Sequence, residues 1–173
     1  HEVADESSVI DFMVADKKHS GSIVSSLSSA RENARTVKEI IPREAWEQIN
    51  ELFHYVTENS SHAFKRRTRY QFLSKIILAN QTITGLLAGT MTHDEAYSFV
   101  RIGRNLERAD MTTRIIDVRS ASLLPELEHE LPAFRNIQWM GVLKSMTAYQ
   151  MYRREVRVRI NRKDVLEFLL LES

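Results

Sequence analysis

Apolar positions that recur in alternating steps of three and four residues constrain the fold of this chain more than any other feature. In segment 22–41 these positions are Ile23, Leu27, Ala30, Ala34, Val37 and Ile41. In segment 95–118 the corresponding positions are Phe99, Ile102, Leu106, Ala109, Thr113 and Ile116. Because an α-helix has about 3.6 residues per turn, such steps place each set in one narrow stripe. Both segments are therefore predicted to be amphipathic helices of a helical bundle.

Shorter stretches repeat the pattern less strictly along the rest of the chain. A weak capping box at Ser8 opens a short helix, Pro42 suits the start of the next one, and Asn161 caps the last. Further helices are predicted over 64–90 and 139–149, and the proline- and glutamate-rich segment 123–132 is predicted to be a connection. Asn80 falls near the centre of the apolar face of 64–90 and is expected to be a hydrogen-bonded core residue.

Only 5 Gly and 3 Pro interrupt the 173 residues, so long uninterrupted helices are favoured. The predicted fold is all-α, a bundle of five or six mostly antiparallel helices. One domain spanning residues 1–173 is expected from the length of the chain.

Composition excludes several function classes. The chain has 24 Lys and Arg against 23 Asp and Glu, so no strong overall field attracts nucleic acid or an anionic membrane, and we expect neither partner. Zero cysteines exclude thiolate metal sites and thiol catalysis. The six histidines include no H-x-x-x-H pair, and neither a G-x-S-x-G elbow nor a Gly-rich phosphate loop occurs. We therefore expect no metal and no cofactor.

The most informative charged residues lie in segment 95–118. Gly103, Glu107, Asp110 and Arg114 fall between its main apolar stripe and a second stripe formed by Met111, Ile115 and Val118. Packing on both sides would partly desolvate these charges, and a buried charge is costly unless it is paired. Asp110 can pair with Arg114 four residues later. A mid-helix glycine costs about 1 kcal/mol relative to alanine, so we expect a neighbouring element to approach Gly103.

A related set lies in segment 28–35. Arg31 and Asn33 flank the apolar stripe of that helix, whereas Glu32 and Arg35 point away from it. If the two helices cross, Arg31 or Arg35 would meet Glu107 or Asp110, and the fork of an arginine matches a carboxylate. Two interpretations stay open at this point: an interhelical ion-pair network that fixes the register of the helices, or a ligand site.

These segments belong to a series of motifs that resembles the bacterial alpha-E family. The motifs, in order, are S-A-R-E-N-A-R (29–35), W-E-Q-I-N (46–50), G-T-M (89–91), I-G-R-N-L-E-R-A-D-M-T-T-R (102–114), W-M-G-V-L-K-S-M-T-A-Y-Q-M-Y-R-R (139–154) and V-L-E-F-L-L-L (165–171). The resemblance covers nearly the whole chain. Family members extend further at both ends, so the resemblance implies that these residues are a central portion of a longer protein.

The resemblance implies an all-helical fold built on paired E-R motifs. Genes of the family tend to stand beside ATP-grasp-like peptide ligases and transglutaminase-like proteins, which implies a role in peptide ligation or protein modification in the bacterial cytoplasm. The motif positions carried over to this chain are Arg31, Glu32, Asn33, Arg35, Gly103, Arg104, Glu107, Arg108, Asp110 and Arg114.

Three functions remain open. The first is a non-catalytic module that binds an ATP-grasp-like or transglutaminase-like partner, or its peptide, through this charged seam. The second is a scaffold in which the same residues are structural ion pairs. The third is an enzyme of peptide-bond chemistry in which Glu107 or Asp110 acts as general base beside Arg114.

Overall fold

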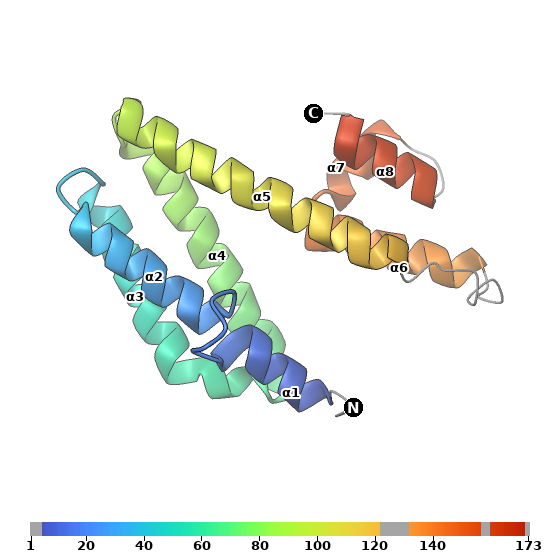
Figure 1. Ribbon diagram of the computed structural model, residues 1–173, viewed down its shortest axis with the longest axis horizontal. Helices are drawn as coiled ribbons and strands as arrows, with labels where there is room; N and C mark the ends of the chain where they lie inside the picture. The colour runs from blue at the N-terminus through green and yellow to red at the C-terminus, as the bar shows by residue number, and fades with distance from the viewer. Residues whose placement is uncertain (1–4, 122–131, 157–159, 172–173) are drawn as a thin grey trace. The chain divides into compact units, whose positions relative to one another are not determined.

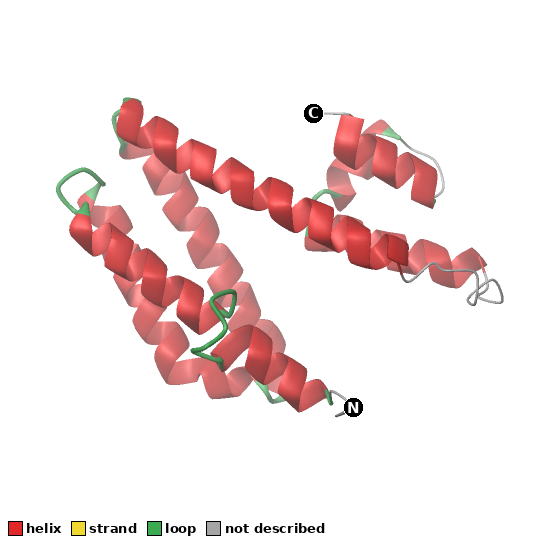
Figure 2. Ribbon diagram, viewed as in Figure 1, coloured by secondary structure: helices red, strands yellow, loops and turns green. Residues whose placement is uncertain are grey.

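The computed structural model of the protein describes residues 5–121, 132–156 and 160–171. In chain order these residues form α1 (Glu6–Ile10), a π-helix (Asp11–Ala15), α2 (Ile23–Thr36), α3 (Arg43–Asn59), a 3-10 helix (Ser60–Ala63), α4 (Arg66–Thr90), α5 (Glu95–Ala121), α6 (Pro132–Ser145), α7 (Tyr149–Glu155) and α8 (Arg162–Leu171) (Figure 1). Every regular element in those ranges is helical and none is a strand (Figure 2). The predicted all-α fold is confirmed.

The chain divides into two compact units, residues 1–99 and residues 100–173. The first unit holds α1 to α4, and α5 begins in the first unit and continues into the second. Each unit has its own cluster of buried apolar side chains. The expectation of one domain over residues 1–173 stays a prediction.

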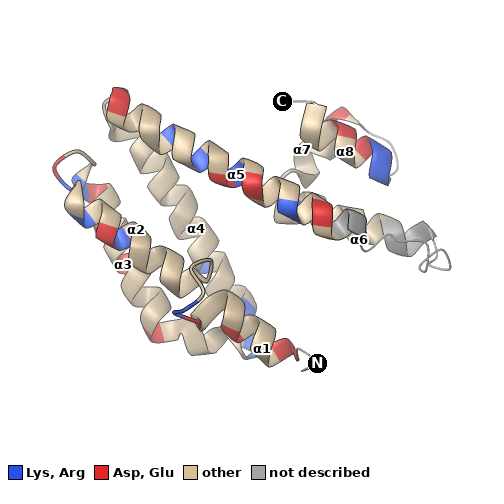
Figure 3. Ribbon diagram, in the orientation of Figure 1, with Lys and Arg blue, Asp and Glu red and all other residues tan. Residues whose placement is uncertain are grey.

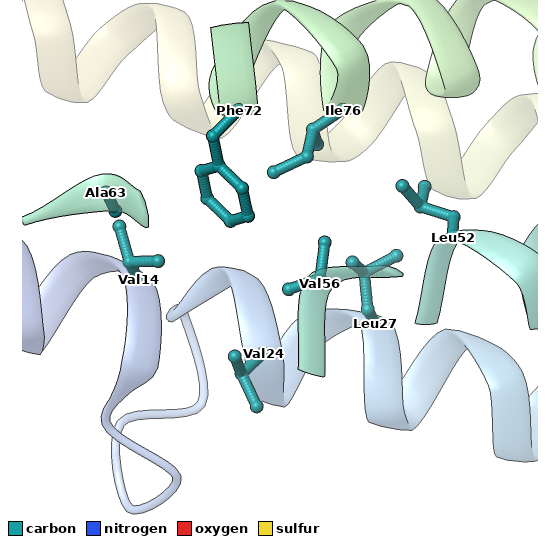
Figure 4. Close-up of a cluster of buried hydrophobic side chains, with 8 residues drawn as sticks. All are labelled: Val14, Val24, Leu27, Leu52, Val56, Ala63, Phe72 and Ile76. Atoms are coloured by element: carbon teal, nitrogen blue, oxygen red, sulfur yellow. The ribbon is translucent and has the colours of Figure 1, made fainter. Parts of the chain in front are cut away.

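In the first unit, α2, α3 and α4 run antiparallel to their neighbours in sequence (Figure 1). Eight buried side chains from these helices and from the π-helix and 3-10 helix point toward one another (Figure 4). The eight are Val14, Val24, Leu27, Leu52, Val56, Ala63, Phe72 and Ile76. Leu27 and Ile76 lie where the periodicity predicts. Ile23, Phe53 and Leu73 are only partly buried and pack against the cluster.

Two helix ends in this unit differ from the prediction. Asp5, and not Ser8, caps α1, since its carboxylate accepts the Ser8 backbone N–H at 2.7 Å. Helix α2 ends at Thr36, although its apolar rhythm continues to Ile41. Pro42 disfavours helical geometry at the residue before it, and the chain turns there instead, with Ile40 N–H donating to the Val37 carbonyl at 2.8 Å.

The core of the second unit is formed by α6, α7 and α8. Its buried members are Trp139, Val142, Leu143, Tyr152, Val165 and Phe168. Ile115 of α5 packs against this cluster. The predicted cap of the last helix is confirmed, because Asp164 N–H donates to Asn161 Oδ1 at 3.0 Å. The connection predicted over 123–132 lies almost entirely outside the described residues, which resume at 132.

Asn80 corrects another expectation. Its side chain is exposed on α4, as are those of Ile77 and Leu78. The apolar face of α4 that is buried runs through Phe72 and Ile76, so Asn80 is not a core residue.

Candidate functional site

Arg31 is the most constrained of the predicted site residues. It lies on α2, is partly buried, and donates from Nε to Asn50 Oδ1 of α3 at 2.7 Å. Its guanidinium carbon lies 4.9 Å from the ring centre of Phe53 and 5.9 Å from that of Trp46. Both distances are within the range of a cation–π contact. The side chain is therefore held in one place on the α2–α3 pair.

The three partners of Arg31 are explained by helical spacing. Trp46, Asn50 and Phe53 are at positions i, i+4 and i+7 of α3, and such positions share one face of a helix. That face packs on α2, where Arg31 flanks the buried positions Leu27 and Ala34. Trp46 and Asn50 belong to the motif W-E-Q-I-N, but neither they nor Phe53 were predicted to be site residues. Their common spacing was the signal that could have identified them.

Glu32 and Arg35 pair with each other on the exposed side of α2. Arg35 donates from Nη2 to Glu32 Oε1 at 2.6 Å and from Nε to Oε2 at 3.0 Å. The bond from Arg35 lowers the pKa of the Glu32 carboxyl below its usual value, and the charge of Arg31 adds a smaller effect. Asn33 is exposed, and its backbone carbonyl accepts the Thr36 hydroxyl at 2.8 Å. An exposed pair of this kind contributes little to stability.

The predicted site residues of α5 are exposed on the helix, so the expectation that packing on both sides desolvates these charges is wrong for the described residues. This exposure holds for Arg104, Glu107, Arg108, Asp110 and Arg114, and charged bands follow α5 along its length (Figure 3). The predicted pair is confirmed, with Arg114 Nε donating to Asp110 Oδ2 at 2.7 Å.

Gly103 has open space where a side chain would begin. Apart from its chain neighbours and the backbone of its own helix, a Cβ at Gly103 would meet no heavy atom of the described chain within 4 Å. The close approach that we expected at Gly103 is thus not seen among the described residues.

The second apolar stripe of α5 is covered only in part. Ile115 packs on the core of the second unit, whereas Met111 and Val118 are exposed. Arg114 also lines a hollow of about 510 Å³ together with Thr113, Ile116, Asp117 and Leu170 of α8.

Arg31 and Arg35 belong to the first unit, whereas Glu107 and Asp110 belong to the second. The predicted pairing between these two sets stays a prediction. Among the described residues, no group of three or more histidine and acidic side chains is arranged to hold a metal ion. None of the described helices combines the length and apolar character that a bilayer crossing demands.

Comparison with known proteins gives one match. The family model Alpha-E, described as "a predicted alpha-helical domain with a conserved ER motif", matches residues 1–173. Glu107 followed by Arg108 is the one place in the chain where arginine follows glutamate directly. No curated protein and no solved structure matches.

Proposed function

The chain belongs to the Alpha-E family, and from that premise we propose that it is a non-catalytic helical module that binds a protein or peptide partner. The partner we propose is an ATP-grasp-like or transglutaminase-like protein, or the peptide on which it acts, in a cytoplasmic peptide-ligation or protein-modification system. We choose these partners because genes of the family tend to stand beside genes for ATP-grasp-like peptide ligases and transglutaminase-like proteins.

One observation carries the proposal: Glu107 and Arg108, which carry the ER dipeptide of the family description, are exposed on α5. Neither side chain belongs to the buried cluster of its unit. A motif shared across a family and exposed to solvent is better explained by contact with a partner than by packing.

Apolar side chains beside the motif support a protein or peptide partner. Ile102 is 53% exposed and Leu106 is 66% exposed on the same helix. Apolar positions rimmed by charges of both signs are the usual composition of a protein interface. Arg104 and Arg108, one turn apart, offer forks for carboxylates of the partner.

Binding between the full-length protein and the ATP-grasp-like or transglutaminase-like protein encoded beside its gene tests the proposal. Calorimetry would give the dissociation constant for the parent protein and for the Glu107→Gln and Arg108→Gln variants. We expect each variant to weaken binding by about tenfold or more, as loss of a charge-assisted contact predicts. Matched controls are Glu47→Gln and Arg43→Gln, which remove the exposed α3 pair Arg43–Glu47.

The same variants separate the two alternatives. If Glu107 is a structural residue, Glu107→Gln lowers the melting temperature and leaves binding unchanged. If Glu107 is a general base, the variant abolishes turnover of a peptide substrate while binding and melting temperature stay the same. Failure of the parent protein to bind either neighbour would overturn the proposed function.

A further inference from the structure

The guanidinium of Arg31 is oriented by its neighbours but is not neutralised by them. Only Nε is used, in the bond to Asn50 Oδ1. Among the described residues, the two terminal nitrogens have no hydrogen-bond or ion-pair partner. Phe53 and Trp46 contact the cation with their rings, which supply no hydrogen-bond acceptor in the plane of the fork.

The nearest acid in sequence does not satisfy this fork. Both carboxylate oxygens of Glu32 accept from Arg35, at 2.6 and 3.0 Å. The positive charge of Arg31 still contributes to the lowered pKa of the Glu32 carboxyl. The two terminal nitrogens of this partly buried guanidinium can therefore donate to an incoming anion.

Phe53, whose ring contacts Arg31, also lines a hollow of about 200 Å³. It is lined by Lys17, Val24, Ser25, Ser28, Phe53 and Thr57. The lining contains one cation, three hydroxyl groups and two apolar side chains, and no carboxylate. Ser28 lies one turn from Arg31 on α2, and Phe53 contributes to both the hollow and the surroundings of Arg31.

We propose that Arg31 and the hollow beside Phe53 together bind an organic carboxylate. The carboxylate would accept hydrogen bonds from the terminal nitrogens of Arg31, and an apolar stem would lie along Phe53 into the hollow. The planar fork of arginine matches a carboxylate with two parallel hydrogen bonds. The phenyl ring and Val24 contact the stem, and Lys17 adds a second positive charge to the lining of the hollow. The proposal is independent of the α5 surface and does not rest on the proposed function.

The carboxylate has two possible sources, a small free acid or the free end of a peptide chain. Two probes represent them: hexanoate, and a short peptide that ends in leucine with a free carboxylate. Hexanamide and the C-terminal amide of the same peptide have the same stems without the charge. Each probe would be titrated into the full chain.

The two tryptophans provide the readout. Trp46 lies beside Arg31, whereas Trp139 is buried in the core of the second unit. In a nitrogen–proton correlation spectrum we expect the indole resonance of Trp46 to shift with hexanoate, while that of Trp139 stays in place. A dissociation constant on the order of 1 mM is expected for so small a ligand. Tighter binding of the peptide acid than of hexanoate identifies a chain terminus as the ligand, and the reverse order identifies a small acid.

Two variants test the role of Arg31. Arg31→Gln removes the charge and should weaken carboxylate binding by about tenfold or more. Asn50→Asp keeps the size of the side chain but supplies an internal carboxylate to Arg31, so it should block the ligand without unfolding the protein. Arg67→Gln, at an exposed arginine of α4, is the matched control and should leave the affinity unchanged.

The proposal is overturned if the Trp46 resonance does not move, if hexanamide shifts it as hexanoate does, or if binding survives in Asn50→Asp. These outcomes are distinct from failure of the proposed function, because that proposal is tested with variants of α5 and a protein partner.

Discussion

Tyr152 presents the clearest energetic anomaly at the scale of one residue. Its side chain is fully buried in the second core, and its hydroxyl has no hydrogen-bond partner among the described residues. Burying a hydroxyl without a partner costs free energy. We therefore expect Tyr152→Phe to raise the free energy of unfolding by about 1 kcal/mol. Chemical denaturation measures this, and a decrease would show that the hydroxyl is bonded in solution.

The same residue predicts a pH dependence. Burial raises the pKa of the Tyr152 phenol above its ordinary value of 10.0, and the charge of Asp164 adds to the shift. A phenol that ionises less readily in the folded state contributes stability below pH 10, and this contribution is lost as the pH rises through and beyond that value. The stability of the parent protein should thus fall more steeply above pH 10 than that of Tyr152→Phe. Parallel slopes would contradict the burial effect.

Two glycines are expected to respond to alanine with opposite signs. A Cβ at Gly21 would lie 2.9 Å from Nε2 of His19, whose ring stacks on Phe12 at 3.9 Å between ring centres. Gly21→Ala must displace this stack and should lower the free energy of unfolding by about 1 kcal/mol. A Cβ at Gly85, inside α4, would meet no atom within 4 Å apart from its chain neighbours and the backbone of its own helix. Gly85→Ala should therefore raise the free energy of unfolding by about 0.5 to 1 kcal/mol. Thermal melting of both variants tests the contrast.

At the scale of elements, Arg69 joins three segments of the first unit. It donates to the Ala63 carbonyl at 2.6 Å, to the Phe64 carbonyl at 3.5 Å and to Glu6 of α1 at 2.7 Å. Its side chain is only 24% exposed. Arg69→Met keeps the apolar stem but removes all three bonds, so we expect a loss of about 1 to 3 kcal/mol.

The control for Arg69 is Glu6→Gln, which weakens only the exposed ion pair. Its bond to Arg69 lowers the pKa of the Glu6 carboxyl, yet the group is exposed and its loss should have a small effect. Equal effects of the two variants in urea denaturation would show that the bonds to the carbonyls contribute nothing.

The elements themselves were largely predictable, because periodicity and caps are local properties of the sequence. Asn161 caps α8 as predicted. Ser22 caps α2 by accepting the Ser25 N–H at 3.1 Å, although no cap was predicted there. The end of α2 was not predicted, because apolar residues keep the helical spacing as far as Ile41, beyond the last helical residue Thr36. Burial of Phe72 rather than Asn80 on α4 could not be predicted either, since it depends on which side of α4 meets α3.

The candidate site illustrates the same limit. Asp110 and Arg114 pair as their spacing predicts, because the interaction lies within one helix. The contact of Arg31 with Asn50 joins two helices, and its existence depends on the register of their packing. A single sequence indicates that Arg31 flanks the core, but it does not identify the residue on α3 that faces it.

At the scale of the whole molecule, two separate cores give two reporters of unfolding. Phe72 belongs to the first cluster and Leu143 to the second, and both are buried almost completely. Truncating a large core side chain to alanine costs about 2 to 5 kcal/mol. Phe72→Ala should therefore lower the unfolding midpoint that Trp46 reports. Leu143→Ala should lower the unfolding midpoint that Trp139 reports. Spectra that resolve the two indole resonances measure both midpoints. If either variant shifts both midpoints equally, residues 1–173 unfold as one cooperative domain, as the length of the chain predicts.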